Sequence, residues 1–160
     1  ADANLPPVVA IDRAPNLSGA LQTIAADIAV IDAPAKADAM AAAILSASDI
    51  ALIVIQPSGA DVWASAATVR LVRQKIELGG KIDAAFLVNR AAANTKLSRL
   101  IKEGDWNEYG VDQMTATVGN RAAFAQAMTD GVSVFDLADT AAQAEINQVI
   151  NELETAKWLD

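Results

Sequence analysis

The sequence predicts a doubly wound α/β domain, with helices on both faces of a mostly parallel sheet. Short apolar runs alternate along the chain with longer segments that have helical character. The run 50–55 is apolar throughout and partly β-branched, which is typical of a parallel strand buried on both faces. The abundance of alanine favours helices that pack closely on a sheet. Because no repeat or low-complexity linker interrupts the pattern, we expect residues 1–160 to form one domain.

Strands are expected where short runs of apolar and β-branched residues are followed by polar or turn-forming residues. These runs are residues 8–11, 28–31, 50–55, 84–88 and 114–118. Helices are expected where apolar residues recur at helical spacing or where alanine dominates. These segments are residues 17–26, 37–47, 58–78, 95–102, 121–129 and 140–159.

The expected helix ends carry capping signals. Asn16 or Ser18 is suited to cap the first helix. Ser58 followed by Asp61 has the spacing of a capping box, so the third helix is expected to begin there. Gly79 and the glycine after it end that helix, as glycine commonly does at a helix carboxyl end.

The composition excludes several kinds of chemistry. The chain has no cysteine and no histidine, which removes thiolate zinc sites, cysteine nucleophiles and Ser-His-Asp arrangements. Any reaction therefore depends on carboxylates, lysine, arginine, hydroxyls or a bound magnesium ion. The net charge is −8, yet the stretch from Val62 to Lys102 contains eight basic and two acidic residues. Such a stretch either presents a local patch to phosphates or forms a solvated helix face.

Polar residues follow the expected strands, and ligands of open parallel sheets bind at the carboxyl ends of the strands. The sharpest signal is the run 28–31, which delivers the carboxylate of Asp32 to the sheet edge. This has the form of a Walker B strand, whose aspartate holds magnesium, commonly through water. The alternative is an aspartate that caps the next helix. Asp12, the segment 56–58 and the pair Asn89–Arg90 stand at the other strand ends.

Six blocks occur in order along the chain and belong together. They are residues 31–35 (Ile-Asp-Ala-Pro-Ala), 48–58 (Ser-Asp-Ile-Ala-Leu-Ile-Val-Ile-Gln-Pro-Ser), 61–64 (Asp-Val-Trp-Ala), 86–90 (Phe-Leu-Val-Asn-Arg), 120–121 (Asn-Arg) and 130–135 (Asp-Gly-Val-Ser-Val-Phe). Together they resemble the ParA family of partition ATPases, relatives of MinD, and most closely its small type. The resemblance begins at about Asp27 and implies a P-loop NTPase-like fold that uses ATP, ADP and Mg²⁺.

The resemblance assigns roles to matching positions. Asp32 would be the Walker B carboxylate, which contributes to catalysis by helping to hold magnesium through water. Asn89, with Arg90, would contact the adenine, although an asparagine at a strand end is also common in turns. The group Pro57, Ser58 and Asp61 would line the nucleotide pocket and the dimer face. Family members often have a polar residue directly after the Walker B aspartate, and this chain has Ala33 there.

The main difference between this sequence and the family is that the phosphate-binding loop is not found in it. Family members begin with a strand, a Lys-Gly-Gly-x-Gly-Lys-Thr loop and a helix, and no such motif is found in this sequence. We therefore expect these residues alone not to hydrolyse ATP, because no row of backbone N–H groups cradles the phosphates. In the family the missing strand lies centrally, beside the Walker B strand. The expected explanation is a portion of a longer protein, and a degenerate relative is the alternative.

The resemblance further implies an ATP-dependent homodimer that binds DNA without sequence preference and a centromere-binding adaptor of the ParB type. The basic residues that could contact DNA are Arg70, Arg73, Lys96, Arg99 and Lys102. A cytoplasmic, nucleoid-associated location is expected, with no membrane segment. Two rival classes remain: a non-catalytic interaction module, and a phospho-acceptor receiver domain. The second needs a paired acidic cluster and a lysine at a later strand end, where Asn89 and Arg90 stand instead.

Overall fold

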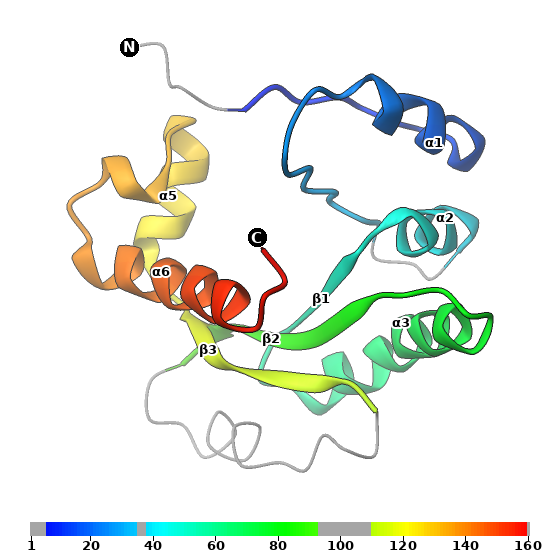
Figure 1. The fold of residues 1–160 in the computed structure, drawn as a ribbon. Coiled ribbons are helices and arrows are strands. Elements are labelled where there is room, and N and C mark those ends of the chain that lie inside the picture. Colours follow the sequence, from blue (N-terminus) through cyan, green and yellow to red (C-terminus); the bar gives the residue numbers. More distant parts are fainter. Residues whose placement is uncertain (1–5, 35–37, 93–109, 160) are drawn as a thin grey trace.

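The computed structural model describes residues 6–34, 38–92 and 110–159. These residues form a parallel sheet with helices packed around it (Figure 1). In chain order the elements are α1 (Ala14–Thr23), α2 (Ala39–Ala47), β1 (Ile50–Ile55), α3 (Gly59–Glu77), β2 (Asp83–Ala91), β3 (Asp112–Gly119), α5 (Ala122–Asp130), the 3₁₀ turn Val134–Asp136 and α6 (Thr140–Thr155).

The three strands form one parallel sheet in the order β1-β2-β3. The register of the first pair is regular, from Ile50 opposite Asp83 to Ile55 opposite Val88. The pairing of β2 with β3 contains two irregularities, between Phe86 and Val88 and between Val88 and Ala91. Among the described residues, β1 pairs on one side only, so the sheet ends at this strand.

Helices cover both faces of the sheet, which confirms the doubly wound α/β prediction. On one face, Val69 of α3 packs with Ile53 and Phe86, and α2 joins this layer through Leu45 and Val72. On the other face, α6 packs against β2 and β3 through Val149, Leu153 and neighbouring side chains. Because successive residues of a strand point to opposite faces, both sides of β2 are buried, and Phe86 is fully covered.

The helix α3 begins and ends where the sequence predicts. Ser58 is its N-cap residue and its hydroxyl accepts a hydrogen bond from the backbone N–H of Asp61. At the other end Gly79 has φ +83°, a left-handed conformation that glycine adopts without a steric cost. Sequence signals at both ends therefore fix this element.

Two predicted strands are wrong. Residues 8–11 and 28–31 have irregular backbone, and their apolar side chains are largely exposed, with Val8 at 91% and Val30 at 92%. A short apolar run cannot form a strand without a neighbour to accept and donate its backbone hydrogen bonds. Asp32 therefore does not stand at the end of a strand, contrary to the prediction.

Several boundaries also differ from the predictions. The first helix, α1, begins three residues earlier than predicted, with Pro15 in its first turn, and neither Asn16 nor Ser18 caps it. The strand β2 extends beyond Val88 and includes Asn89 and Arg90. The helix α6 ends four residues before Leu159. In Figure 1, α1 lies outside the sheet and packs on α2.

The helix predicted over residues 95–102 lies outside the described residues. Within the described ranges, no helix combines the length and apolar character needed to cross a membrane.

Candidate nucleotide-binding edge

The parallel sheet brings three predicted segments to one edge. The strands β1 and β3 lead into Gln56–Ser58 and Asn120–Arg121, and Asn89 and Arg90 lie in the last residues of β2. Since all three strands run in the same direction, these ends meet on the side of the sheet where ligands bind in open α/β folds. Six residues were predicted to bind nucleotide or magnesium. Five of them, Pro57, Ser58, Asp61, Asn89 and Arg90, therefore lie at or next to this edge, and Asp32 does not.

The loop after β1 is held by its own polar groups. Oδ2 of Asp61 accepts a hydrogen bond from the backbone N–H of Gln56 at 3.0 Å, and the hydroxyl of Ser58 accepts one from the N–H of Asp61 at 3.4 Å. Pro57, between them, has no N–H to satisfy. Ser58 and Asp61 thus stabilise the start of α3. This structural role is the alternative to a role in binding nucleotide.

The end of β2 has an unusual backbone. Arg90 has φ +52°, a left-handed conformation that is uncommon for a residue other than glycine. The side-chain Oδ1 of the half-buried Asn89 accepts a hydrogen bond from the N–H of Arg90 at 2.7 Å. Because its oxygen is used in this way, Asn89 has its amide NH₂ group left to offer a ligand. The exposed Arg90 side chain extends from the same end of β2.

The end of β3 is fixed by a carboxylate from α6. Glu145 accepts hydrogen bonds from Nε and Nη2 of Arg121, at 3.0 and 2.8 Å, through Oε1. Its second oxygen, Oε2, accepts the backbone N–H of Gly119 at 2.9 Å. In the sequence, Arg121 stands out only as part of a family block and Glu145 does not stand out at all, because no local signal links residues 24 positions apart.

The pKa of Arg121 is raised above its usual value, first because of its hydrogen bond to Glu145 and then because of the negative charges of Glu145 and Asp139. A raised pKa adds stability below the ordinary pKa of arginine and loses it only as pH rises through the raised value. The protonation of Arg121 is therefore constant throughout the neutral range.

A second carboxylate of α6, two helical turns further on, binds the middle of β3. Glu152 accepts the N–H groups of Thr115 and Ala116, both at 2.7 Å, and the hydroxyl of Thr115 at 2.9 Å. The two N–H groups are adjacent in sequence and both face the helix because the strand is irregular there. Both carboxylates thus satisfy backbone groups along the outer side of β3, where the described residues provide no further strand.

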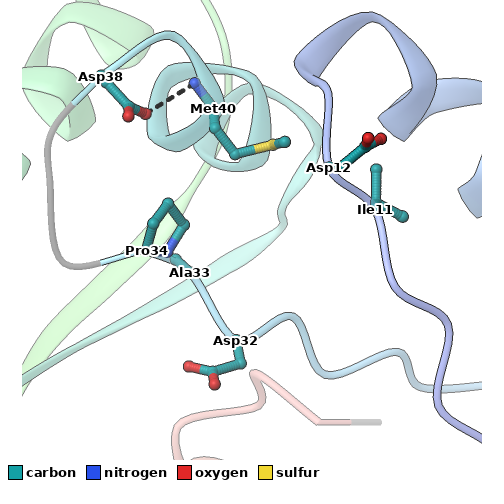
Figure 2. Close-up of a pocket in the computed structure, with 7 residues that line it drawn as sticks. All are labelled: Ile11, Asp12, Asp32, Ala33, Pro34, Asp38 and Met40. Atoms are coloured by element: carbon teal, nitrogen blue, oxygen red, sulfur yellow. Dashed lines mark hydrogen bonds between the residues drawn. The ribbon is translucent and has the colours of Figure 1, made fainter.

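Asp32 lines a different, open pocket of about 460 Å³ with Asp12, Asp38 and four other residues. Figure 2 shows the three carboxylates pointing in different directions. That of Asp38 accepts the N–H groups of Met40 and Ala41, at 2.9 and 3.3 Å, and so caps α2. Asp32 itself is exposed.

The described residues do not fit a magnesium–triphosphate group by themselves. Within them, no cluster of three or more acidic, histidine or cysteine side chains could hold a metal ion. Asp32 stands apart from the edge that carries Asn89, and the sequence provides no glycine-rich loop to cradle phosphates.

Of the residues predicted to contact DNA, two are described. Arg70 and Arg73 lie on exposed positions of α3. The guanidinium of Arg73 lies close to Gly110, where an added Cβ would come within 2.9 Å of Nη2. The other three, Lys96, Arg99 and Lys102, lie outside the described residues.

The parallel three-stranded sheet flanked by helices is consistent with a P-loop NTPase-like α/β fold. The chain is 32% identical over 130 residues to maintenance of carboxysome distribution protein A of Halothiobacillus neapolitanus. The similarity covers 79% of this chain and 60% of that protein, and it supports a ParA/MinD-like relationship. No family model matches the chain.

Proposed function

We propose that this chain is the part of a ParA-type ATPase that follows its phosphate-binding loop, and that the protein positions a cellular cargo. The observation that carries the proposal is the 32% identity to a protein named for maintaining the distribution of carboxysomes. The chain spans about 60% of that relative's length, so the activity proposed here is that of the complete protein.

Two observations on β1 support a missing neighbour in the sheet. Among the described residues β1 pairs with β2 alone, and Val54, whose side chain lies on the face away from α3, is 56% exposed although it belongs to an apolar strand. The segment 28–31, with Ile28 at 59% and Val30 at 92%, is equally uncovered. In the complete protein, we propose, a strand lies between β1 and this segment and buries both. Burial of this apolar surface would stabilise the sheet and bring Asp32 to the edge that carries Asn89.

We assign a role to each residue of the proposed nucleotide site. Asp32 holds magnesium through water, and Asn89 with Arg90 contacts the adenine of ATP or ADP. The loop residues Pro57, Ser58 and Asp61 line the pocket and the face of a homodimer. Support comes from the shared sheet edge of the last five and from the amide NH₂ of Asn89, which has no hydrogen-bond partner among the described residues.

The partners of the complete protein are proposed from the same relationship. Arg70 and Arg73, with Lys96, Arg99 and Lys102, form a surface for DNA of any sequence. An adaptor protein of the ParB type or an equivalent connects the protein to its cargo. The cargo is either a DNA molecule, as in partition, or a protein body, as the name of the relative suggests. A cytoplasmic, nucleoid-associated location follows from this role.

A non-catalytic interaction module is the second candidate, because Asp32 is exposed and detached from the sheet in this structure. Sedimentation of the complete protein with ATP and magnesium, and separately with ADP, distinguishes the two. A positioning ATPase forms a dimer with ATP and a monomer with ADP. An interaction module sediments identically in both nucleotides, and that result would remove the ATPase proposal.

A further inference from the structure

The carboxylate of Glu145 connects α6 to two neighbouring positions at the end of β3. It comes from α6, accepts the backbone N–H of Gly119 at the end of β3, and accepts two hydrogen bonds from Arg121. The Glu145 side chain is 19% exposed and that of Arg121 is 37% exposed. Hydrogen bonds to a mostly buried charged group are among the stronger ones in proteins.

The approach is close because residue 119 is glycine. An added Cβ there would lie 3.0 Å from Oε1 of Glu145 and 3.2 Å from Oε2, which is tighter than ordinary contact. A side chain at this position would therefore push the carboxylate away from the strand end. The glycine serves the contact with Glu145 and not a left-handed backbone, since its φ is not positive.

The end of β3 is joined directly to the end of β2. The backbone N–H of Asn120 donates to the carbonyl of Ala91 at 3.1 Å, and Ala91 is paired with Gly119. Ala91 follows the left-handed Arg90, whose N–H holds the side chain of Asn89. Hydrogen bonds and covalent backbone links thus alternate along a path from Glu145 to the end of β2 that carries Asn89.

We infer that Glu145 and Arg121 are positioning residues. They hold the end of β2, with Asn89 and Arg90, in place for the base of a nucleotide. The inference rests on the proposed function for the identity of the ligand. The two residues act through the backbone of Asn120 and Ala91 and do not touch the ligand themselves. Glu152 provides an internal comparison, because it bonds the middle of β3 and not its carboxyl end.

The test compares Glu145→Gln with the matched control Glu152→Gln in the complete protein, with a fluorescent ATP analogue and magnesium as the probe. A glutamine at either position loses charge and presents an NH₂ group to backbone donors, so both variants lose thermal stability. Binding of the analogue is measured well below both unfolding temperatures. Glu145→Gln should bind about tenfold more weakly, the scale of one charge-assisted hydrogen bond, while Glu152→Gln stays near wild type.

A double-mutant cycle with Asn89→Ala separates positioning from a general loss of stability. If Glu145 acts through Asn89, then Glu145→Gln has little further effect on binding once Asn89 is alanine. Equal losses in the Glu145 and Glu152 variants, or additive losses with Asn89→Ala, would overturn the inference. Should Glu145→Gln not fold, Gly119→Ala takes its place and should weaken binding in the same direction.

If the proposed function is wrong, the binding experiment gives a different result from the one that would overturn the positioning role. If the wild-type protein does not bind the analogue, the proposed ligand is wrong, and amide hydrogen exchange then decides the positioning role. The Asn120 N–H should exchange faster in Glu145→Gln than in Glu152→Gln, relative to wild type. Equal exchange rates in the two variants would overturn the inference independently of any nucleotide.

Discussion

Oδ2 of Asp61 lies 3.0 Å from the backbone nitrogen of Gln56 and accepts its hydrogen bond, so a side chain in the first turn of α3 holds the end of β1. Asparagine keeps an acceptor oxygen at this position and alanine does not. Asp61→Ala should therefore lower the free energy of unfolding by about 1 kcal/mol, the usual cost of losing such a bond. Asp61→Asn should cost less, and urea denaturation measures both.

The same pair of variants also tests the proposed binding role of Asp61. If Asp61 only starts the helix, the asparagine variant binds nucleotide as well as wild type does. A loss of nucleotide affinity in Asp61→Asn, with unfolding unchanged, would show that the carboxylate also faces the ligand.

Lys75 of α3 holds the end of α2. Its Nζ donates to the backbone carbonyls of Leu45, Ser46 and Ser48, at 3.0, 3.1 and 2.7 Å. Carbonyls at a helix carboxyl end lack partners within the helix, and a cation there is favourable. Lys75→Met keeps most of the aliphatic stem and should cost roughly 1–2 kcal/mol of stability. Lys81→Met is the control, since Lys81 is exposed in the loop between α3 and β2, and it should leave the unfolding midpoint unchanged.

Trp63 is 81% exposed near the start of α3, beside the loop proposed to face the dimer partner. Trp63→Ala should change stability by no more than about 0.5 kcal/mol, because the side chain buries little surface in this chain. It should nevertheless weaken ATP-dependent dimerisation, as measured by sedimentation equilibrium. Leu78→Ala, equally exposed just beyond the other end of α3, serves as the matched control and should dimerise normally. Equal dimerisation of both variants would place the interface elsewhere.

Arg70 is exposed on α3 and is proposed to contact a DNA phosphate. Arg70→Ala should weaken binding to duplexes of any sequence and reduce the slope of log K against log salt by about 1, because one fewer counterion is released. Arg13→Ala removes an equally exposed arginine whose ion pair with Asp12 is long, at 3.9 Å, and should leave the slope unchanged. An unaltered slope in Arg70→Ala would exclude this side chain from the DNA surface.

Local signals predicted the elements that lie in the sheet and its covering helices. The apolar run of β1 and the Ser58 cap of α3 were both read correctly, because each depends on residues close together in sequence. The two wrong strands, residues 8–11 and 28–31, have equally apolar sequences but no strand beside them in the described structure. A strand depends on its neighbour, and the local sequence does not report whether one is present.

The candidate site was predictable to a similar extent. The positions of Asn89 and Ser58 at one edge follow from the parallel direction of the strands, which the sequence predicts. The hydrogen bonds of Glu145 and Glu152 to β3 could not be predicted, because they join α6 to backbone groups 26 and 36–37 residues away. The left-handed backbone of Arg90 was equally unpredictable, since arginine carries no preference for it.

The central claim is that the complete protein binds a magnesium–ATP complex with the help of Asp32. Its most direct test is an equilibrium titration of a fluorescent ATP analogue into the complete protein and into its Asp32→Ala variant, each with magnesium and with excess chelator. We predict saturable binding by the wild-type protein that depends on magnesium, and loss of that magnesium dependence in the variant. Binding that is absent from the wild-type protein, or that responds to magnesium identically in the two proteins, would contradict the claim.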